Sequence, residues 1–170
     1  KKYKPTKHGI YNLLGNVAEW TLSPAYNFTD SSKVFFNKET KVIHEVSGDI
    51  LLTKAKAVAH GVAPNDHMDK GLALALRDSW PAMAKDFRHY AHQTHPRAGE
   101  IWVWGGVGGV RIFNLLTQDG EHGKDTKPGR ATLSNVTHCL RRLRHELEKG
   151  EIKSLAMSKL ATGIGGLDWN

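Results

Sequence analysis

The pattern of hydrophobic and polar positions changes near residue 40. Residues 1–40 are polar and rich in turn-forming residues, and they show no sustained period. From residue 41 onward, short strand-like runs alternate with helix-like runs, as expected of an α/β domain built around a sheet. We therefore divide the chain into an N-terminal extension, residues 1–40, and a globular part, residues 41–170.

Within the globular part, short hydrophobic runs predict strands and longer periodic runs predict helices. Pro81 is expected to separate the first two helices. The glycines of residues 105–109 favour a flexible hairpin connection, and the polar stretch 117–129 favours a loop. The expected strands are residues 42–46, 57–62, 101–104, 110–116 and 154–159, and the first two helices are residues 72–80 and 82–93.

The clearest helix follows the polar loop. Its leucines and valine recur at steps of three and four, which places them on one face. Thr132 is a suitable N-cap, and Gly150 is a suitable residue to end the helix. The positions expected on the buried face are Leu133, Val136, Leu140, Leu143 and Leu147.

Composition narrows the class of protein. The chain has 170 residues, 39% of them hydrophobic, and a formal net charge of +7, which favours anionic ligands or partners. The lone Cys139 excludes an internal disulfide, and no apolar run has the length of a membrane span. No secretory signal opens the sequence. We expect a cytoplasmic monomer with no membrane partner, and we expect neither a metal nor a cofactor.

Two glycine-bearing segments, residues 60–71 and 163–166, each follow a predicted strand. Backbone N–H groups in such loops can hold phosphate oxygens, because glycine lets the main chain approach closely. Ordinary structural turns would give the same pattern. No dinucleotide-binding or P-loop fingerprint is present, which disfavours those two nucleotide-binding classes.

Several short motifs follow one another along the globular part: residues 46–50, 59–62, 71–75, 96–101, 114–118 and 163–169. Together, and in this order, they resemble the macrodomain family. They are similar to the subgroup that contains terminal ADP-ribose glycohydrolases, DNA de-ADP-ribosylating antitoxins and yeast-type ADP-ribose-1''-phosphatases. The resemblance covers about three quarters of the chain and implies a three-layer α/β/α fold with a mixed central sheet. It also implies that the domain is truncated at its C-terminal end.

Within residues 1–40, residues 9–20 resemble the signature of formylglycine-generating, lectin-like domains. We interpret this stretch as either the remnant of a fused upstream domain or an accidental match. Forty residues are too few for that fold. No function is carried over from it.

The macrodomain resemblance implies that the chain binds ADP-ribose, free or attached to protein or nucleic acid. Asp49 would accept a hydrogen bond from the adenine amino group, although a turn or helix cap would also explain it. Asn65 would face the distal ribose. Residues 68–71 would form the first phosphate loop and residues 163–166 the second. The expected ligand-binding residues are Asp49, Ile50, Asn65, Met68, Asp69, Lys70, Gly71, Thr117, Thr162, Gly163, Ile164, Gly165 and Gly166.

Catalysis is the open question. Lysine-dependent relatives carry a lysine directly after the threonine of the strand-end motif, whereas Gln118 follows Thr117 here, and Gly165 stands where some relatives carry an acid. His60 matches a histidine that phosphatase-type relatives place beside the distal ribose, where it could transfer a proton or merely shape the pocket. We therefore predict that the chain hydrolyses ADP-ribose derivatives at the distal ribose, either ADP-ribose-1''-phosphate or ADP-ribosyl groups on protein or nucleic acid, with His60 catalytic. The alternative is a non-catalytic ADP-ribose reader. A basic nucleic-acid-binding domain is a third possibility.

Overall fold

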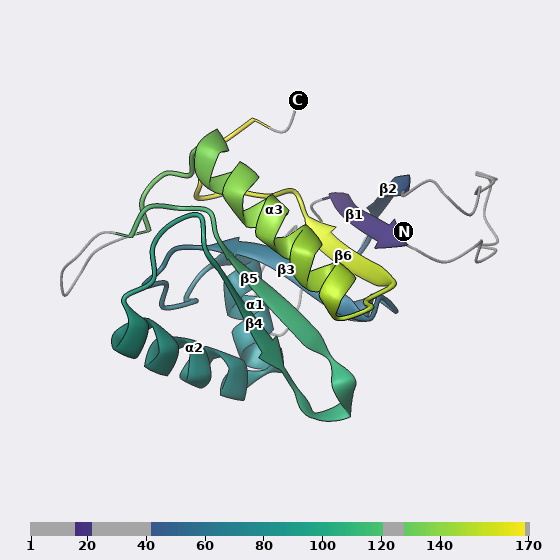
Figure 1. Cartoon of the computed structure of the whole chain (residues 1–170), viewed down its shortest axis with the longest axis horizontal. Coiled ribbons are helices and arrows are strands. Elements are labelled where there is room, and N and C mark those ends of the chain that lie inside the picture. The colour runs from purple at the N-terminus through teal and green to yellow at the C-terminus, as the bar shows by residue number, and fades with distance from the viewer. Residues whose placement is uncertain (1–15, 22–41, 121–127, 169–170) are drawn as a thin grey trace.

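The computed structural model describes residues 16–21, 42–120 and 128–168. In these ranges the strands form one six-stranded mixed sheet with the order β2-β1-β6-β3-β5-β4 (Figure 1). The two outer strands of this order are β2 and β4. The strands are β1 (Asn16–Thr21), β2 (Val42–Ser47), β3 (Ala57–Val62), β4 (Ile101–Gly105), β5 (Arg111–Leu116) and β6 (Ser154–Ser158).

The sheet is mixed because β3 is parallel to both β5 and β6, whereas β4 is antiparallel to β5. At the other end, β1 is antiparallel to both β6 and β2. β1 lies in the segment that the sequence separates from the globular part, and yet it pairs with two strands of the globular part. The domain boundary near residue 40 stays a prediction.

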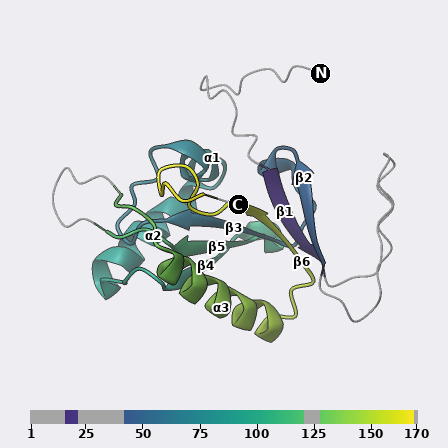
Figure 2. The ribbon, with the colours of Figure 1, turned by 90° about the horizontal axis from the view of Figure 1, so that it is seen from above.

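Helices cover both faces of the sheet. The helices are α1 (Gly71–Ser79), α2 (Pro81–Thr94) and α3 (Leu133–Lys149), with 3-10 turns η1 (Ile50–Leu52) and η2 (Val107–Gly109). Figure 2 shows α1 and α3 on opposite sides of the strands. The three-layer α/β/α architecture predicted from the sequence is therefore confirmed.

Strand alternation divides the core into two layers. Even-numbered residues of β3 and β5, such as Val58 and Ile112, pack with Leu76 of α1 and Phe87 of α2. Odd-numbered residues, such as Phe113, face α3. Each layer therefore draws its apolar side chains from both a helix and the sheet, and β3 and β5 are buried on both faces.

Most local predictions agree with the structure. α3 begins after Thr132, whose hydroxyl accepts a hydrogen bond from the Asn135 amide at 3.1 Å, and it ends at Gly150. Leu143 is buried, as its position on the apolar face predicted. Leu133 was wrongly expected on the buried face: it is the first residue of α3 and is 71% exposed.

Candidate functional site

The predicted site loops meet at one edge of the sheet. Parallel strands end at the same edge, so the segments that follow β3, β5 and β6 emerge side by side. A Cβ atom added to Gly61 near the end of β3 would lie 2.7 Å from Thr117 Oγ1 and 3.8 Å from the Ala161 nitrogen. These three residues come from the three strand ends, so the loops are in direct contact at their base.

Asp49 lies at this same edge because β2 runs in the same direction as β6, with β1 antiparallel between them. It caps η1: one carboxylate oxygen accepts a hydrogen bond from the Leu51 amide at 2.9 Å. The side chain is half-buried, and its other oxygen has no partner within the described ranges. Ile50 is only 4% exposed and belongs to the core, so it supports the turn from below.

The first loop is shaped by a residue that the sequence reasoning missed. The Asp66 carboxylate accepts hydrogen bonds from the Met68 amide at 2.7 Å and the Ala63 amide at 3.3 Å. Burial raises the pKa of Asp66, although these two bonds favour the carboxylate. Met68 is held in the left-handed region, with φ of 53°, and its side chain is 1% exposed. Met68 is therefore an anchor for the loop. The sequence holds one signal for this role. An aspartate in a loop often accepts a hydrogen bond from the backbone amide two residues later, and for Asp66 that amide belongs to Met68.

Four predicted residues of this segment reach the surface: Asn65, Asp69, Lys70 and Gly71 are all exposed. Lys70 precedes α1 without a side-chain capping bond, and Gly71 adopts a left-handed φ of 58°. A Cβ atom on Gly120 would lie 3.0 Å from the Asn65 side-chain oxygen, so Asn65 extends toward the segment after β5. The N-terminus of α1 therefore opens onto the same edge as the other loops.

The second loop is a tight turn that requires glycine at two positions. The Gly166 amide donates to the Gly163 carbonyl at 3.1 Å, and Gly166 has a φ of 70°. Gly165 is buried, and a Cβ atom there would lie 2.6 Å from the Ala161 carbonyl oxygen. Ala161 itself has a φ of 60°, so the backbone is unusual on both sides of the turn.

The second loop presents its middle to solvent. Gly163 is exposed and Ile164 is 52% exposed. The Thr162 hydroxyl donates to the Lys159 carbonyl at 3.2 Å, which fixes the start of the turn. The buried Gly165 carbonyl accepts a hydrogen bond from the Ala131 amide at 3.1 Å, which connects the turn to the segment before α3. Of the predicted ligand-binding residues in this second loop, the most exposed are therefore Gly163, Ile164 and Gly166.

His60 is placed differently from the exposed loop residues. It is 1% exposed, and its Nε2 donates to the Asn114 side-chain oxygen at 2.8 Å, across the β3–β5 pairing. Asn114 in turn donates to the Trp102 carbonyl at 3.4 Å. Burial lowers the pKa of His60 to about 4, so the ring is neutral near pH 7. Its Nδ1 is buried with no hydrogen-bond partner among the described residues.

Thr117 directly follows β5 and is buried beneath the loops at the carboxyl edge of the sheet. It is 0% exposed, and its hydroxyl has no partner in the described part of the chain. Gln118, which follows it, is 5% exposed and pairs with Ala131 through an isolated bridge. In this structure, both side chains therefore lie below the exposed surface of the loops.

Within the part of the chain that the structure describes, no group of three or more His, Cys, Asp or Glu side chains is arranged to hold a metal ion. None of the helices there is both long and apolar enough to cross a membrane.

The sequence matches no family model and no curated protein. Solved structures do match. The macrodomain of Mycobacterium tuberculosis DarG has 26% identity and a TM-score of 0.63, over 72% of this chain and 79% of that one. The macrodomain of Thermus aquaticus DarG has 24% identity and a TM-score of 0.61, with the same coverage.

A third match is Thermosipho africanus DarTG in complex with ADP-ribose, with 21% identity and a TM-score of 0.63. It covers 73% of this chain, which spans only about a third, 34%, of that longer protein. The chain therefore has the macrodomain fold.

Proposed function

We propose that this chain binds ADP-ribose at the carboxyl edge of its sheet. One observation carries the proposal: the loops after β3, β5 and β6 meet there, two of them with glycine in left-handed backbone. A pyrophosphate suits such an edge because backbone amides and a helix N-terminus can receive its oxygens. The related DarTG structure contains ADP-ribose, which supports this choice of ligand.

Each part of the ligand has a proposed contact. The free oxygen of Asp49 would accept from the adenine amino group, and residues 163–166 would hold the pyrophosphate. Lys70, exposed at the start of α1, would add positive charge near the phosphates. Asn65 would face the distal ribose. Met68 and Thr117, both buried, would act by shaping the loops.

Binding without chemistry is the role that the geometry supports best. His60 is neutral, enclosed and already bonded to Asn114, which suits a residue that shapes the pocket. A pKa of about 4 makes its free Nδ1 a weak base, and near pH 7 the ring lacks the imidazolium proton that a general acid would donate. Gln118 stands where lysine-dependent relatives carry their lysine. We therefore favour a reader of ADP-ribosyl groups.

Hydrolysis at the distal ribose is the second candidate, and the unpartnered Nδ1 of His60 is the observation that favours it. Turnover assays with ADP-ribose-1''-phosphate, ADP-ribosylated protein and ADP-ribosylated DNA separate the two roles. A reader gives no product from any of them while binding ADP-ribose. Product formation that His60→Gln abolishes, with ADP-ribose affinity retained, would instead establish the hydrolase.

The binding proposal is tested by calorimetry with ADP-ribose. Asp49→Ala removes both the η1 cap and the proposed adenine contact, and we expect binding to weaken by about 1–3 kcal/mol. Asp49→Asn separates the two effects: its amide oxygen can still cap the Leu51 amide, but its NH₂ group cannot accept from adenine.

If the adenine role is right, Asp49→Asn also loses affinity for ADP-ribose. It should then gain relative affinity for the hypoxanthine analogue, whose carbonyl accepts a hydrogen bond. Unchanged ADP-ribose binding by both variants would refute the adenine contact. No binding by the wild-type chain would refute the proposed function itself.

A further inference from the structure

β4 is an edge strand with unpaired backbone groups. It is the last strand in the sheet order of the described residues, next to β5 on one side only (Figure 1). The Glu100 carbonyl accepts from the Leu116 amide at 2.9 Å, and the Gly106 amide donates to the Val110 carbonyl at 2.9 Å. The backbone N–H and C=O groups of the even-numbered residues therefore point toward β5. By strand alternation, the N–H and C=O groups of Ile101 and Val103 point outward.

β4 lacks two features that commonly protect an edge strand, proline and charged residues. Its sequence, Ile-Trp-Val-Trp-Gly, contains no proline and no charged residue. Edge strands are commonly protected by such residues, because open N–H and C=O groups pair readily with another chain. The edge is therefore suited to accepting a further strand.

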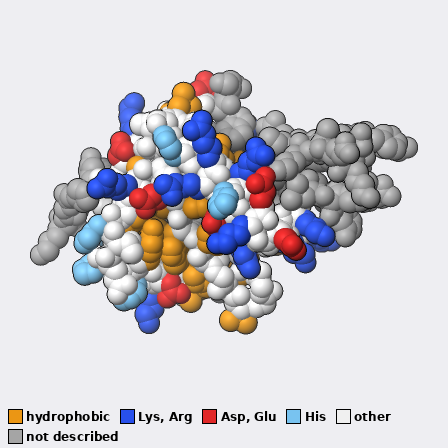
Figure 3. Space-filling model, viewed as in Figure 1, with side chains coloured by type: hydrophobic (Ala, Val, Ile, Leu, Met, Phe, Trp, Pro, Cys, Tyr) orange, Lys and Arg blue, Asp and Glu red, His pale blue; other side chains and the backbone are white. Residues whose placement is uncertain are grey.

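A groove of about 520 Å³ lies between β4 and α3. Its floor is the half-buried side chains of Ile101 and Val103, and its wall is Arg141, Arg142, His145 and Glu146 from α3. The two arginines outnumber the one carboxylate, and both are exposed. Figure 3 shows hydrophobic side chains gathered in the middle of this view, with basic, acidic and histidine side chains around them.

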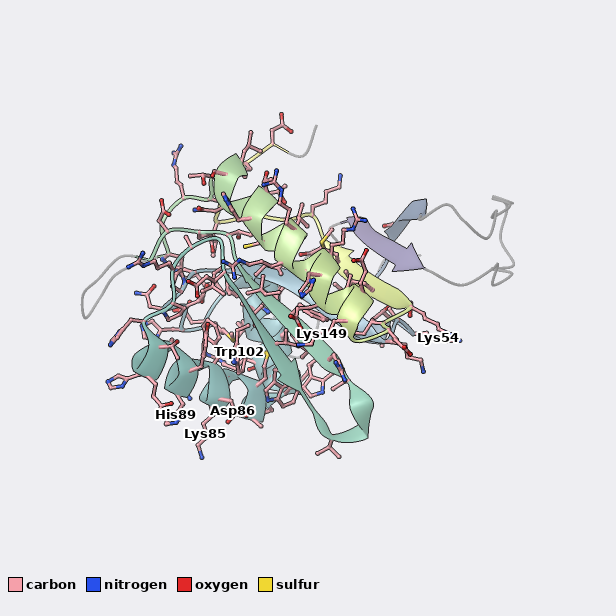
Figure 4. All side chains as sticks on the ribbon, in the orientation of Figure 1. Lys54, Lys85, Asp86, His89, Trp102 and Lys149 are labelled. Atoms are coloured by element: carbon pink, nitrogen blue, oxygen red, sulfur yellow. The ribbon has the colours of Figure 1, made fainter. Side chains whose placement is uncertain are left out.

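The other face of β4 is aromatic. Trp102 stacks on Tyr90 of α2, with ring centroids 5.5 Å apart, and the Trp104 indole donates to Asp86 at 3.0 Å. Figure 4 shows Trp102 beside the α2 residues Lys85, Asp86 and His89. A strand added to β4 would thus have arginines above one row of its side chains and tryptophans beside the other row.

We propose that β4 and the α3 groove bind an extended acidic peptide segment as an added strand. Acidic side chains at alternate positions would face Arg141 and Arg142, and aliphatic side chains between them would pack beside Trp102 and Trp104. Main-chain hydrogen bonds to Ile101 and Val103 would provide affinity, and the charge pattern would provide specificity. This surface is separate from the proposed ADP-ribose site, so the two proposals can fail independently.

A peptide fits this surface better than the other possible occupants. A nucleic acid could pair with the arginines but has no peptide backbone to complete the sheet edge. A second copy of the chain could pair β4 with β4 about a two-fold axis. That arrangement would place both α3 helices on the same face, with the arginines of the two copies opposed. Like charges across an interface oppose association.

The test is fluorescence anisotropy with a labelled hexapeptide of alternating glutamate and valine, its ends blocked. We expect saturable binding that weakens as salt is added. The same peptide, N-methylated at the residues that would face β4, should lose binding, because it cannot donate to the Val103 and Ile101 carbonyls. Equal binding of both peptides, or no binding of either, would overturn the proposal.

Charge reversal tests the groove. Arg142→Glu should weaken peptide binding about tenfold or more and leave ADP-ribose binding unchanged. Lys54→Glu makes the same charge change at an exposed residue far from the groove, as Figure 4 shows, and should have little effect. Equal losses in the two variants would show general charge attraction only. Sedimentation analysis that found a stable dimer through β4, with no competition by the peptide, would also contradict the proposal.

Discussion

Alanine substitutions in the second loop give the sharpest test of its geometry. Gly163, Gly165 and Gly166 lie within four residues of one another, and an added Cβ atom would meet different conditions at each. Around a Cβ on Gly163 nothing lies within 4 Å, and its φ is not left-handed. Gly166 also has open space but a φ of 70°, whereas Gly165 would place its Cβ 2.6 Å from the Ala161 carbonyl oxygen.

The expected costs follow from these differences. In Gly165→Ala the new methyl group would clash with backbone atoms of Ala161, which cannot rotate away as a side chain could. We expect this overpacking to lower the free energy of unfolding by about 2 kcal/mol. Gly166→Ala places an alanine in the left-handed region, which should lower the free energy of unfolding by about 1 kcal/mol. Gly163→Ala should be neutral or stabilise by about 0.5 kcal/mol, because it restricts only the unfolded chain. For a chain of this size, Gly165→Ala should lower the melting temperature by about 4–8 °C.

Urea and thermal unfolding of the three variants, compared with the wild-type chain, measure these costs. ADP-ribose calorimetry on the same samples shows whether a deformed second loop also loses the ligand, as the proposed phosphate role requires. The reasoning is refuted if Gly163→Ala destabilises the protein as much as Gly165→Ala. It is equally refuted if Gly165→Ala costs nothing.

Three further predictions concern single side chains. Burial raises the pKa of the Cys139 thiol to about 12, so it should resist alkylation in the native protein and react once urea unfolds it; rapid native labelling would contradict its burial. Because burial lowers the pKa of His60 from 6.5 to about 4, the unfolded chain binds the extra proton between these values. Stability should therefore fall as pH drops from 6.5 to 4, by up to about 3 kcal/mol, and urea titrations should find less of this loss in His60→Gln. Thr132→Ala should cost about 1 kcal/mol of unfolding free energy by removing the α3 cap, while Thr132→Ser should cost much less.

The fold was accessible from the sequence because local and long-range signals agree. The step of three and four in α3 and the flanking Thr132 and Gly150 predicted that helix and its ends. Pro81 marked the break between α1 and α2, since α1 ends at Ser79 and α2 begins at Pro81. Leu133 was misplaced because periodicity assigns a face of a helix but not which turns of that face are covered by the rest of the protein.

The candidate site was accessible only in part. The motifs placed glycines and polar residues near strand ends, and the sheet topology brings those strand ends together. Burial could not be foreseen: nothing in the sequence indicates that the His60 ring is enclosed and paired with Asn114, because that pair comes from the register of two distant strands. Asp66 was missed because its hydrogen-bond partners are backbone amides. Every residue except proline carries such an amide, so the sequence does not single these partners out.

The placement of β6 has a consequence for synthesis on the ribosome. Of the described strands β6 is made last, and it lies between β1 and β3, with Leu155 beside Ala57 in the register. Until β6 emerges, the apolar strand β3 is unpaired on one side, so the described sheet cannot close while its earlier strands are being made. Such late, long-range pairing favours slow folding and leaves β3 open to aggregation until β6 is in place.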